Sequence, residues 1–167
     1  MKLKSIILLF FVFIYHGLGA QTADTIKVNR GNLIIHFLGH GSLMFEYDGK
    51  IIHIDPFSVV ADYKTLPKAD LILLTHHHGD HLDSAALASV YTKTTTLYWT
   101  VECEKSSKFK VSGNVLKNGD KLIWKGILIE SVPAYNLVNK RQNGNYYHPM
   151  GEGNGYILTF GNKRVYV

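Results

Sequence analysis

The chain has 167 residues, of which 46% are hydrophobic and 19% are charged. These proportions suit one compact globular domain and argue against a disordered chain or a repeat array. The net charge is +5, and the basic residues are scattered without a dense cationic run interleaved with aromatic residues. We therefore expect no nucleic-acid partner.

Residues 1–20 have the three regions of a secretory signal peptide. Met1–Lys4 is basic, Ser5–Tyr15 is almost wholly apolar, and Leu18–Ala20 offers small residues at a cleavage site. The apolar run is shorter than the ~20 residues that a membrane-spanning helix needs, and the alternative is an uncleaved N-terminal anchor. We predict an exported protein, periplasmic or secreted, whose mature domain covers residues 21–167 and has no stable membrane span after cleavage.

Cys103 is the only cysteine of the chain. No intrachain disulfide can form, even in an exported protein, and the fold must rely on its core. No motif surrounds this cysteine, so we expect a small, partly buried apolar residue rather than a nucleophile.

The first part of the mature chain is predicted to be a β-meander. Apolar-rich strands are expected at 33–38, 42–47 and 50–55. The pair Asp48-Gly49 separates the second strand from the third, and it tolerates the positive φ angles of a tight hairpin turn.

A strand, a histidine-rich loop and the one clear helix follow each other directly. Residues 71–74 are a continuous apolar run, typical of a strand that is covered on both faces. Asp83 can cap a helix over residues 84–91. The loop between them, 75–81, therefore lies at the carboxyl end of a buried strand, where open α/β sheets place their ligands.

The remaining elements are predicted to be short strands with turns. We expect strands at 96–100, 121–124 and 127–132, a Gly- and Asn-rich loop over 136–155, and a final hairpin formed by residues 156–160 and 163–167.

The loop after the buried strand reads Thr75-His76-His77-His78-Gly79-Asp80-His81. Imidazole and carboxylate ligands suit zinc, iron or manganese, and a structural zinc site would recruit cysteines, which are not nearby. His76 and His78 can reach one ion, and Asp80 and His81 can face a second. A metal pair gives hydroxide at neutral pH, so the cluster predicts hydrolysis. The alternative is a surface histidine tract that binds metal incidentally.

Asp80 is the residue that we assign to catalysis within this loop. Its carboxylate either accepts a hydrogen bond from the attacking hydroxide or holds a metal. His77 alternates with His76 and His78, so it should point away from the metals.

Three further residues are candidates near the site. His148 is the only histidine after His81 and could complete the first metal's ligands; the alternative is an exposed loop residue. His40, between Gly39 and Gly41, could line the site from a neighbouring loop. Asp55 could accept the second N–H of a ligating histidine, as metal sites usually require, or could simply cap a turn.

The histidine cluster resembles the H-x-H-x-D-H signature of the metallo-β-lactamase superfamily. Further segments are similar to its ascorbate-phosphate lactonase-like branch: Leu38–Ser42, Asp48–Lys50, Ile54–Pro56, Val132–Asn136 and His148–Tyr156. The resemblance covers residues 33–167 and is more specific than any single motif.

The resemblance implies an α+β fold, the αββα metallo-β-lactamase sandwich. It also implies two metal ions, most often zinc and sometimes manganese or iron. His76, His78 and His148 match ligands of the first metal, while Asp80 and His81 match ligands of the second.

In the family, a strand like 163–167 runs into a Gly-Asp-Thr segment whose aspartate bridges both metals. That segment is not in this sequence, so we expect only the N-terminal part of the sandwich, truncated at its C-terminus.

The predicted function is a metal-dependent hydrolase that uses a metal-activated hydroxide on a small ester, lactone or phosphate-containing substrate. We expect this chain alone to be poorly active. The main alternative is a non-catalytic metal-binding remnant that lacks the bridging aspartate. A true β-lactamase fits the residues around Val132–Asn136 less well, and a nuclease fits the export signal and weak basic patterning less well.

Overall fold

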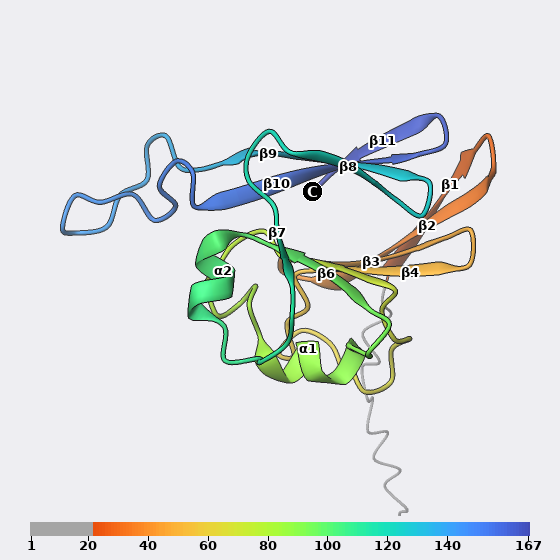
Figure 1. Ribbon diagram of the computed structural model, residues 1–167, viewed down its shortest axis with the longest axis horizontal. Coiled ribbons are helices and arrows are strands. Elements are labelled where there is room, and N and C mark those ends of the chain that lie inside the picture. Colours follow the sequence, from red (N-terminus) through yellow and green to blue (C-terminus); the bar gives the residue numbers. More distant parts are fainter. Residues whose placement is uncertain (1–21) are drawn as a thin grey trace, which may run out of the picture.

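The structure is a computed structural model that describes residues 22–167. The predicted signal peptide, residues 1–20, lies outside the described residues. Two sheets pack face to face, and both helices lie on one side of the pair (Figure 1). No helix of the described part is long and apolar enough to cross a membrane.

Sheet A has seven strands in the order β1-β2-β3-β4-β5-β6-β7. The first four strands form an antiparallel meander, and β4 to β7 run parallel to one another. The strands are β1 (Thr22–Val28), β2 (Gly31–Gly39), β3 (Ser42–Tyr47), β4 (Lys50–Ile54), β5 (Leu71–Leu73), β6 (Thr96–Trp99) and β7 (Asn114–Val115).

Sheet B is antiparallel, with four strands in the order β11-β10-β9-β8. Its strands are β8 (Lys121–Trp124), β9 (Ile127–Ala134), β10 (Gly153–Phe160) and β11 (Lys163–Tyr166). The segment between β9 and β10 projects from the body of the molecule, on the left of Figure 1.

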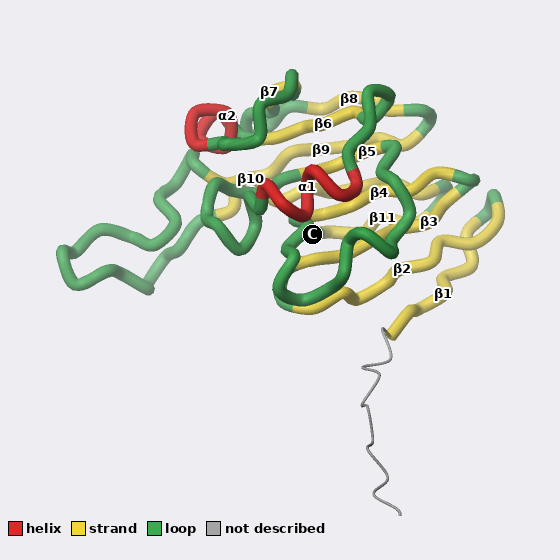
Figure 2. Tube along the Cα trace, turned by 90° about the horizontal axis from the view of Figure 1, so that it is seen from below, coloured by secondary structure: helices red, strands yellow, loops and turns green. Residues whose placement is uncertain are grey.

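The helices are α1 (Ser84–Val90) and α2 (Val101–Ser106). Asp83 begins α1, because its side chain accepts hydrogen bonds from the backbone N–H groups of Ala85 and Ala86. Thr100 begins α2 in the same way through the N–H of Cys103. Seen from below in Figure 2, α1 lies over the strands of sheet A and α2 lies beside the end of β6.

The core has two parts, one on each face of sheet A. Between the sheets, Phe45, Ile52 and Leu71 pack against residues of sheet B such as Ile129 and Leu158. Between sheet A and the helices, a second cluster is built from the following side chains: Ile72, Leu74, Ala86, Leu87, Val90 and Cys103. Fully burying a Leu or Ile side chain contributes roughly 1.5–3 kcal/mol each, so both clusters stabilise the layers. The layers run helices, sheet A, sheet B, which is part of the αββα sandwich.

The structure confirms the predicted meander, the turn and the capped helix. Asp48 and Gly49 have φ angles of +50° and +69°, as the predicted hairpin turn requires. Leu71–Leu73 is buried on both faces. Cys103 is fully buried, and this burial raises its pKa to about 11.

The prediction of a single helix and of a meander starting at residue 33 was incomplete. The short helix α2 follows β6 immediately, and β1 adds a strand before the predicted first one. The strand β7 has only two residues and carries no periodic signal.

The topology brings several chain segments to one edge of sheet A. In the parallel pair β4 and β5, Ile54 lies opposite Leu73, so both strands end at the same edge. Since β2 and β4 both run antiparallel to β3, the turn after Gly39 lies at this edge too. The candidate site is built there.

Candidate metal centre

Asp55 is a buried carboxylate at the end of β4, with 2% of its surface exposed and a φ angle of +43°. Its Oδ1 accepts a hydrogen bond from the Thr75 backbone N–H at 2.8 Å. Its Oδ2 accepts bonds from the Thr75 hydroxyl at 2.5 Å and from Nδ1 of His81 at 2.7 Å. Both oxygens are therefore occupied, and Asp55 holds the tautomer of His81 that leaves Nε2 free.

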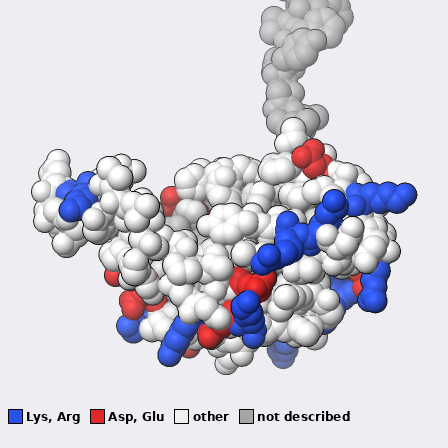
Figure 3. Space-filling model, turned by 90° about the horizontal axis from the view of Figure 1, so that it is seen from above, with Lys and Arg blue, Asp and Glu red and all other residues white. Residues whose placement is uncertain are grey.

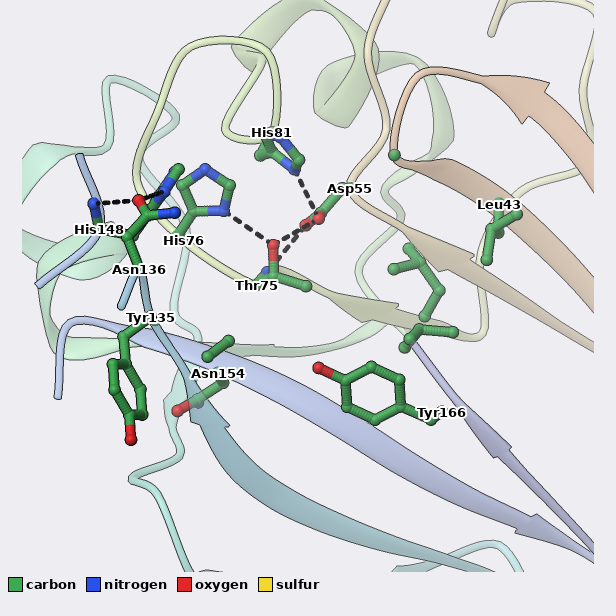
Figure 4. Close-up of a pocket in the computed structure, with 15 residues that line it drawn as sticks. Leu43, Asp55, Thr75, His76, His81, Tyr135, Asn136, His148, Asn154 and Tyr166 are labelled. Atoms are coloured by element: carbon green, nitrogen blue, oxygen red, sulfur yellow. Dashed lines mark hydrogen bonds and ion pairs between the residues drawn. The ribbon is translucent and has the colours of Figure 1, made fainter. Parts of the chain in front are cut away.

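Thr75 extends this hydrogen-bond chain to a second histidine. Its hydroxyl lies 2.9 Å from Nδ1 of His76. Because the hydroxyl donates to Asp55, it is left to accept from the Nδ1–H of His76, so that Nε2 of His76 is also free. Figure 4 shows the chain from His76 through Thr75 and Asp55 to His81.

His76, His78 and His148 form the first group of possible metal ligands. One ring nitrogen from each lies within 4.8 Å of the others. The ring centroid of His148 lies 4.7 Å from that of His76 and 4.8 Å from that of His78. The structure thus brings the loop after β5 together with His148, which lies 67 residues after His81, the last histidine of that loop.

Asn136 holds His148 in this position. Its side-chain oxygen accepts hydrogen bonds from the His148 backbone N–H at 3.0 Å and from Nδ1 of the same ring at 2.7 Å. The Asn136 backbone N–H donates to the carbonyl of His148 at 2.9 Å. These bonds leave Nε2 of His148 available (Figure 4).

His40, Asp80 and His81 form the second group, again with donor atoms within 4.8 Å of one another. Nε2 of His40 lies 2.9 Å from Oδ2 of Asp80, and Nε2 of His81 lies 3.9 Å from the same oxygen. His40 was predicted only to line the site, whereas here it stands among the possible ligands.

Gly41 explains how His81 fits beside the turn that follows β2. A Cβ atom built on Gly41 would lie 2.9 Å from Cε1 of His81, closer than side chains tolerate. The turn therefore needs a glycine for this approach, in addition to the left-handed backbone of His40, whose φ is +52°.

A third group, Asp55 with His76 and His81, also has its donor atoms within 4.8 Å. Both oxygens of Asp55 already accept hydrogen bonds, so an orienting position suits Asp55 better than a place as a ligand. His77 belongs to none of the three groups. It is partly buried, and its Nδ1 has no hydrogen-bond partner among residues 22–167.

The pKa values of the first group keep its rings neutral near pH 7. Burial and the neighbouring histidines lower the pKa of His76 to about 3. Burial, followed by nearby positive groups, also lowers the pKa of His78 and of His148. Neutral imidazoles are the form that binds metal ions, so these three rings suit a cation without first losing a proton.

The second group has the opposite electrostatic character. Burial acts to lower the pKa of His81, but the hydrogen bond and charge of Asp55 outweigh it and raise the pKa. Burial acts to raise the pKa of Asp80, but its own backbone N–H and the charges of His81 and His40 lower it. Asp80 is therefore a carboxylate at neutral pH, the form that accepts hydrogen bonds and binds cations.

A cavity of about 360 Å³ lies beside these groups. Its wall includes His76, His81 and His148, together with Tyr135 and Leu43 (Figure 4). A small, largely apolar cavity with possible metal ligands on its wall is typical of a site that binds a small molecule.

The donor set fits a divalent transition metal. It combines imidazoles with one carboxylate and contains no thiolate, which matches zinc, manganese or iron better than calcium. Two residues that complete this arrangement, Thr75 and Asn136, were not predicted as site residues. Thr75 directly precedes His76, and Asn136 begins the Gly- and Asn-rich loop, but neither position by itself indicates an orienting role.

The chain is similar to several known proteins. It is 30% identical over 138 residues to the UPF0173 metal-dependent hydrolase PYRAB05000 of Pyrococcus abyssi, an alignment that covers 79% of this chain and 59% of that protein. Over a shorter stretch of 54 residues, it is 52% identical to a UPF0173 metal-dependent hydrolase of Flavobacterium johnsoniae, which covers 29% of this chain and 24% of the relative. The chain thus spans about 59% of the length of the Pyrococcus relative.

Solved structures share the fold. One match is the crystal structure of a protein from Parabacteroides distasonis that is named as a metal-dependent hydrolase. The two chains are 45% identical with a TM-score of 0.80, and the match covers 88% of this chain and 65% of that one. The metallo hydrolase Igni18 of Ignicoccus hospitalis matches at 22% identity with a TM-score of 0.58, covering 80% and 59%. The latter likeness concerns the fold alone.

The sequence profile described as the β-lactamase superfamily domain matches residues 34–166, which include strands β3 to β11 and every histidine of the two ligand groups. The architecture and this match agree with the resemblance found in the histidine cluster. This chain belongs to the β-lactamase superfamily and has the metallo-β-lactamase fold.

Proposed function

We propose that the chain carries the metal-binding part of a metal-dependent hydrolase that acts on a small ester, lactone or phosphate-containing substrate. The observation that supports this most directly is the convergence of three neutral imidazoles, His76, His78 and His148, on one side of a small cavity. Relatives named as metal-dependent hydrolases add support.

In this proposal the first group, His76, His78 and His148, holds one divalent cation, Zn²⁺, with Mn²⁺ or Fe²⁺ as alternatives. Asp80 and His81 hold a second cation, and His40 stands within reach of it. Bound there, such ions lower the pKa of water to about 7 and polarise a carbonyl or phosphoryl oxygen of the substrate.

The residues of the chain itself supply orientation and proton control. Asp55 keeps a proton on Nδ1 of His81, and the Thr75 hydroxyl oxygen accepts a hydrogen bond from the Nδ1–H of His76. Asn136 does the same for His148. Asp80 is the ionised group nearest to His40 and is the candidate to accept a proton or a hydrogen bond during the reaction.

Hydrolysis assays on the mature chain test the proposal. The chain, loaded in turn with Zn²⁺, Mn²⁺ and Fe²⁺, is assayed against an aryl ester, a lactone and an aryl phosphodiester. We expect weak metal-dependent turnover of at least one substrate class, and its loss in the double variant His76→Ala, His78→Ala. Metal binding without turnover of any of the three would instead favour a non-catalytic metal-binding chain.

We also propose that the protein is exported. The basic, apolar and small-residue regions of residues 1–20 support this. Mass spectrometry of the chain expressed with its full N-terminus in a bacterial host, after separation of periplasm and cytoplasm, is expected to find a periplasmic form that begins at Gln21. An intact N-terminus in the membrane fraction would favour the uncleaved anchor.

A further inference from the structure

The segment between β9 and β10, here called the 136–152 loop, has an ordered tip. Lys140 and Tyr146 form an antiparallel bridge. Within it, the Arg141 N–H donates to the carbonyl of Asn145 at 2.7 Å, and the Gly144 N–H donates to the carbonyl of Arg141 at 2.9 Å. Since Arg141 both donates and accepts in this turn, its backbone is fixed.

The side chain of Arg141 reaches back from this tip to the candidate metal centre. One terminal nitrogen, Nη2, lies 3.4 Å from Nε2 of His78. The guanidinium carbon lies 4.7 Å from the ring centroid of Tyr147, so the cation packs against an aromatic ring. Such packing holds the planar group while leaving several of its five N–H donors free.

Arg141 and His78 line a second cleft of about 500 Å³, which also includes Tyr147, His77 and Glu152. The first cavity contains His76 and His148 instead. The first ligand group therefore borders both the 360 Å³ cavity and the 500 Å³ cleft, and Arg141 lines the cleft beside His78. In Figure 3 the projecting loop carries one group of basic atoms among uncharged ones, and Lys140 and Arg141 are the only Lys and Arg residues between 136 and 152.

Within the described part of the chain, the charge of Arg141 has no acidic side chain as a partner. Among the ion pairs of residues 22–167, each of which joins atoms within 4.0 Å, none involves Arg141. Glu152 lines the same cleft but does not pair with it. A permanent cation beside a group that binds a divalent cation repels that ion unless an anion lies between them.

We propose that Arg141 is a specificity-determining residue that binds an anionic group of the substrate, a carboxylate or a phosphate, beside the first ligand group. A guanidinium presents two parallel N–H donors that match either group. This inference rests on the proposed hydrolase function. It narrows the substrate class to esters, lactones or phosphate compounds that carry an additional negative charge.

A binding measurement tests the anion site without any turnover. Succinate and inorganic phosphate are titrated into the mature chain by calorimetry, both with and without Zn²⁺. Arg141→Gln is expected to weaken binding of at least one of the two anions by about tenfold or more, as the loss of a charged hydrogen bond predicts. The anion with the larger loss identifies the recognised group.

Lys140→Gln is the matched control, because it removes the neighbouring cation of the same loop, which packs over Tyr146 instead. Its effect on binding of either anion is expected to be less than about twofold, on the scale of an exposed charge. Equal thermal stability and equal zinc content of the two variants show that the loop and the metal centre are intact. Unchanged binding of both anions in Arg141→Gln would overturn the inference.

A turnover measurement then separates this inference from the proposed function. The ratio of kcat/KM for mono(4-nitrophenyl) succinate to that for 4-nitrophenyl acetate is expected to fall about tenfold or more in Arg141→Gln and to stay constant in Lys140→Gln. A constant ratio in Arg141→Gln contradicts the inference. Absence of metal-dependent turnover of both esters counts against the proposed ester hydrolysis, while weakened anion binding in Arg141→Gln would still support the anion site.

Discussion

Nδ1 of His81 lies 2.7 Å from Oδ2 of Asp55, a residue 26 positions earlier in the chain. The same carboxylate binds the backbone N–H and the hydroxyl of Thr75, which in turn contacts His76. One buried carboxylate thus orients a ring in each of the two ligand groups, and the two groups are coupled through it.

Asp55→Asn is expected to weaken zinc binding by about 10- to 100-fold, the usual cost of removing a partner that orients a ligand. The amide has a single acceptor oxygen, whereas Thr75 and His81 use both oxygens of the carboxylate. Competition with a chromophoric chelator measures the affinity. Asp24→Asn makes the same chemical change on an exposed position of β1 and should retain wild-type affinity.

Gly41→Ala is expected to reduce zinc affinity at the second ligand group by about tenfold, because the new Cβ would lie 2.9 Å from Cε1 of His81 and would displace the ring. Gly79→Ala provides the control within the histidine loop, since a Cβ there meets nothing within 4 Å. Calorimetric titration with zinc distinguishes the two variants. Equal affinities would show that the position of His81 does not matter for metal binding.

Asn136→Ala is expected to weaken zinc binding at the first ligand group by about tenfold. The variant loses the two side-chain hydrogen bonds that hold the backbone and the ring of His148. Asn32→Ala, at an exposed position of β2, is the matched control. Zinc affinity that is identical in both variants would mean that His148 does not contribute to the site.

The stability of the metal-free protein should fall in acid partly because of His53. This buried ring on β4 donates a hydrogen bond from Nε2 to the carbonyl oxygen of Pro67 at 3.0 Å, and burial lowers its pKa from 6.5 to about 4. Between those pH values the unfolded chain binds a proton that the folded chain does not, so the free energy of unfolding decreases as the pH falls.

The expected slope from His53 is at most about 1.4 kcal/mol per pH unit between pH 6.5 and 4. His53→Gln keeps a donor for the Pro67 carbonyl and does not titrate. Urea unfolding at several pH values in the presence of a chelator should therefore give a shallower slope for the variant than for the wild-type chain. Parallel slopes would mean that His53 has an ordinary pKa in the folded protein.

Local sequence signals were sufficient to predict much of the fold. Asp48-Gly49 supplies the turn that fixes the register of β3 and β4, and Asp83 caps α1 as its position before the apolar helix face predicts. The helix α2 was missed because it has only six residues, although Thr100 followed by Glu102 and Glu104 is a typical start of a helix.

The arrangement of the site depended on contacts between distant segments and could be predicted only in part. The histidine cluster itself identified the family, because its spacing is local to one loop. The contacts of Asn136 with His148, of Thr75 with Asp55 and of Arg141 with His78 arise from the topology of the two sheets. No periodicity or turn signal in the sequence indicates them.

Anomalous diffraction at the zinc edge, from crystals of residues 21–167 grown with zinc, would show which side chains hold the metal. The structure predicts a zinc peak within bonding distance, about 2.0–2.1 Å, of a ring nitrogen from each of His76, His78 and His148. A zinc peak bound elsewhere, or no peak within bonding distance of any two of these three histidines, would contradict the account.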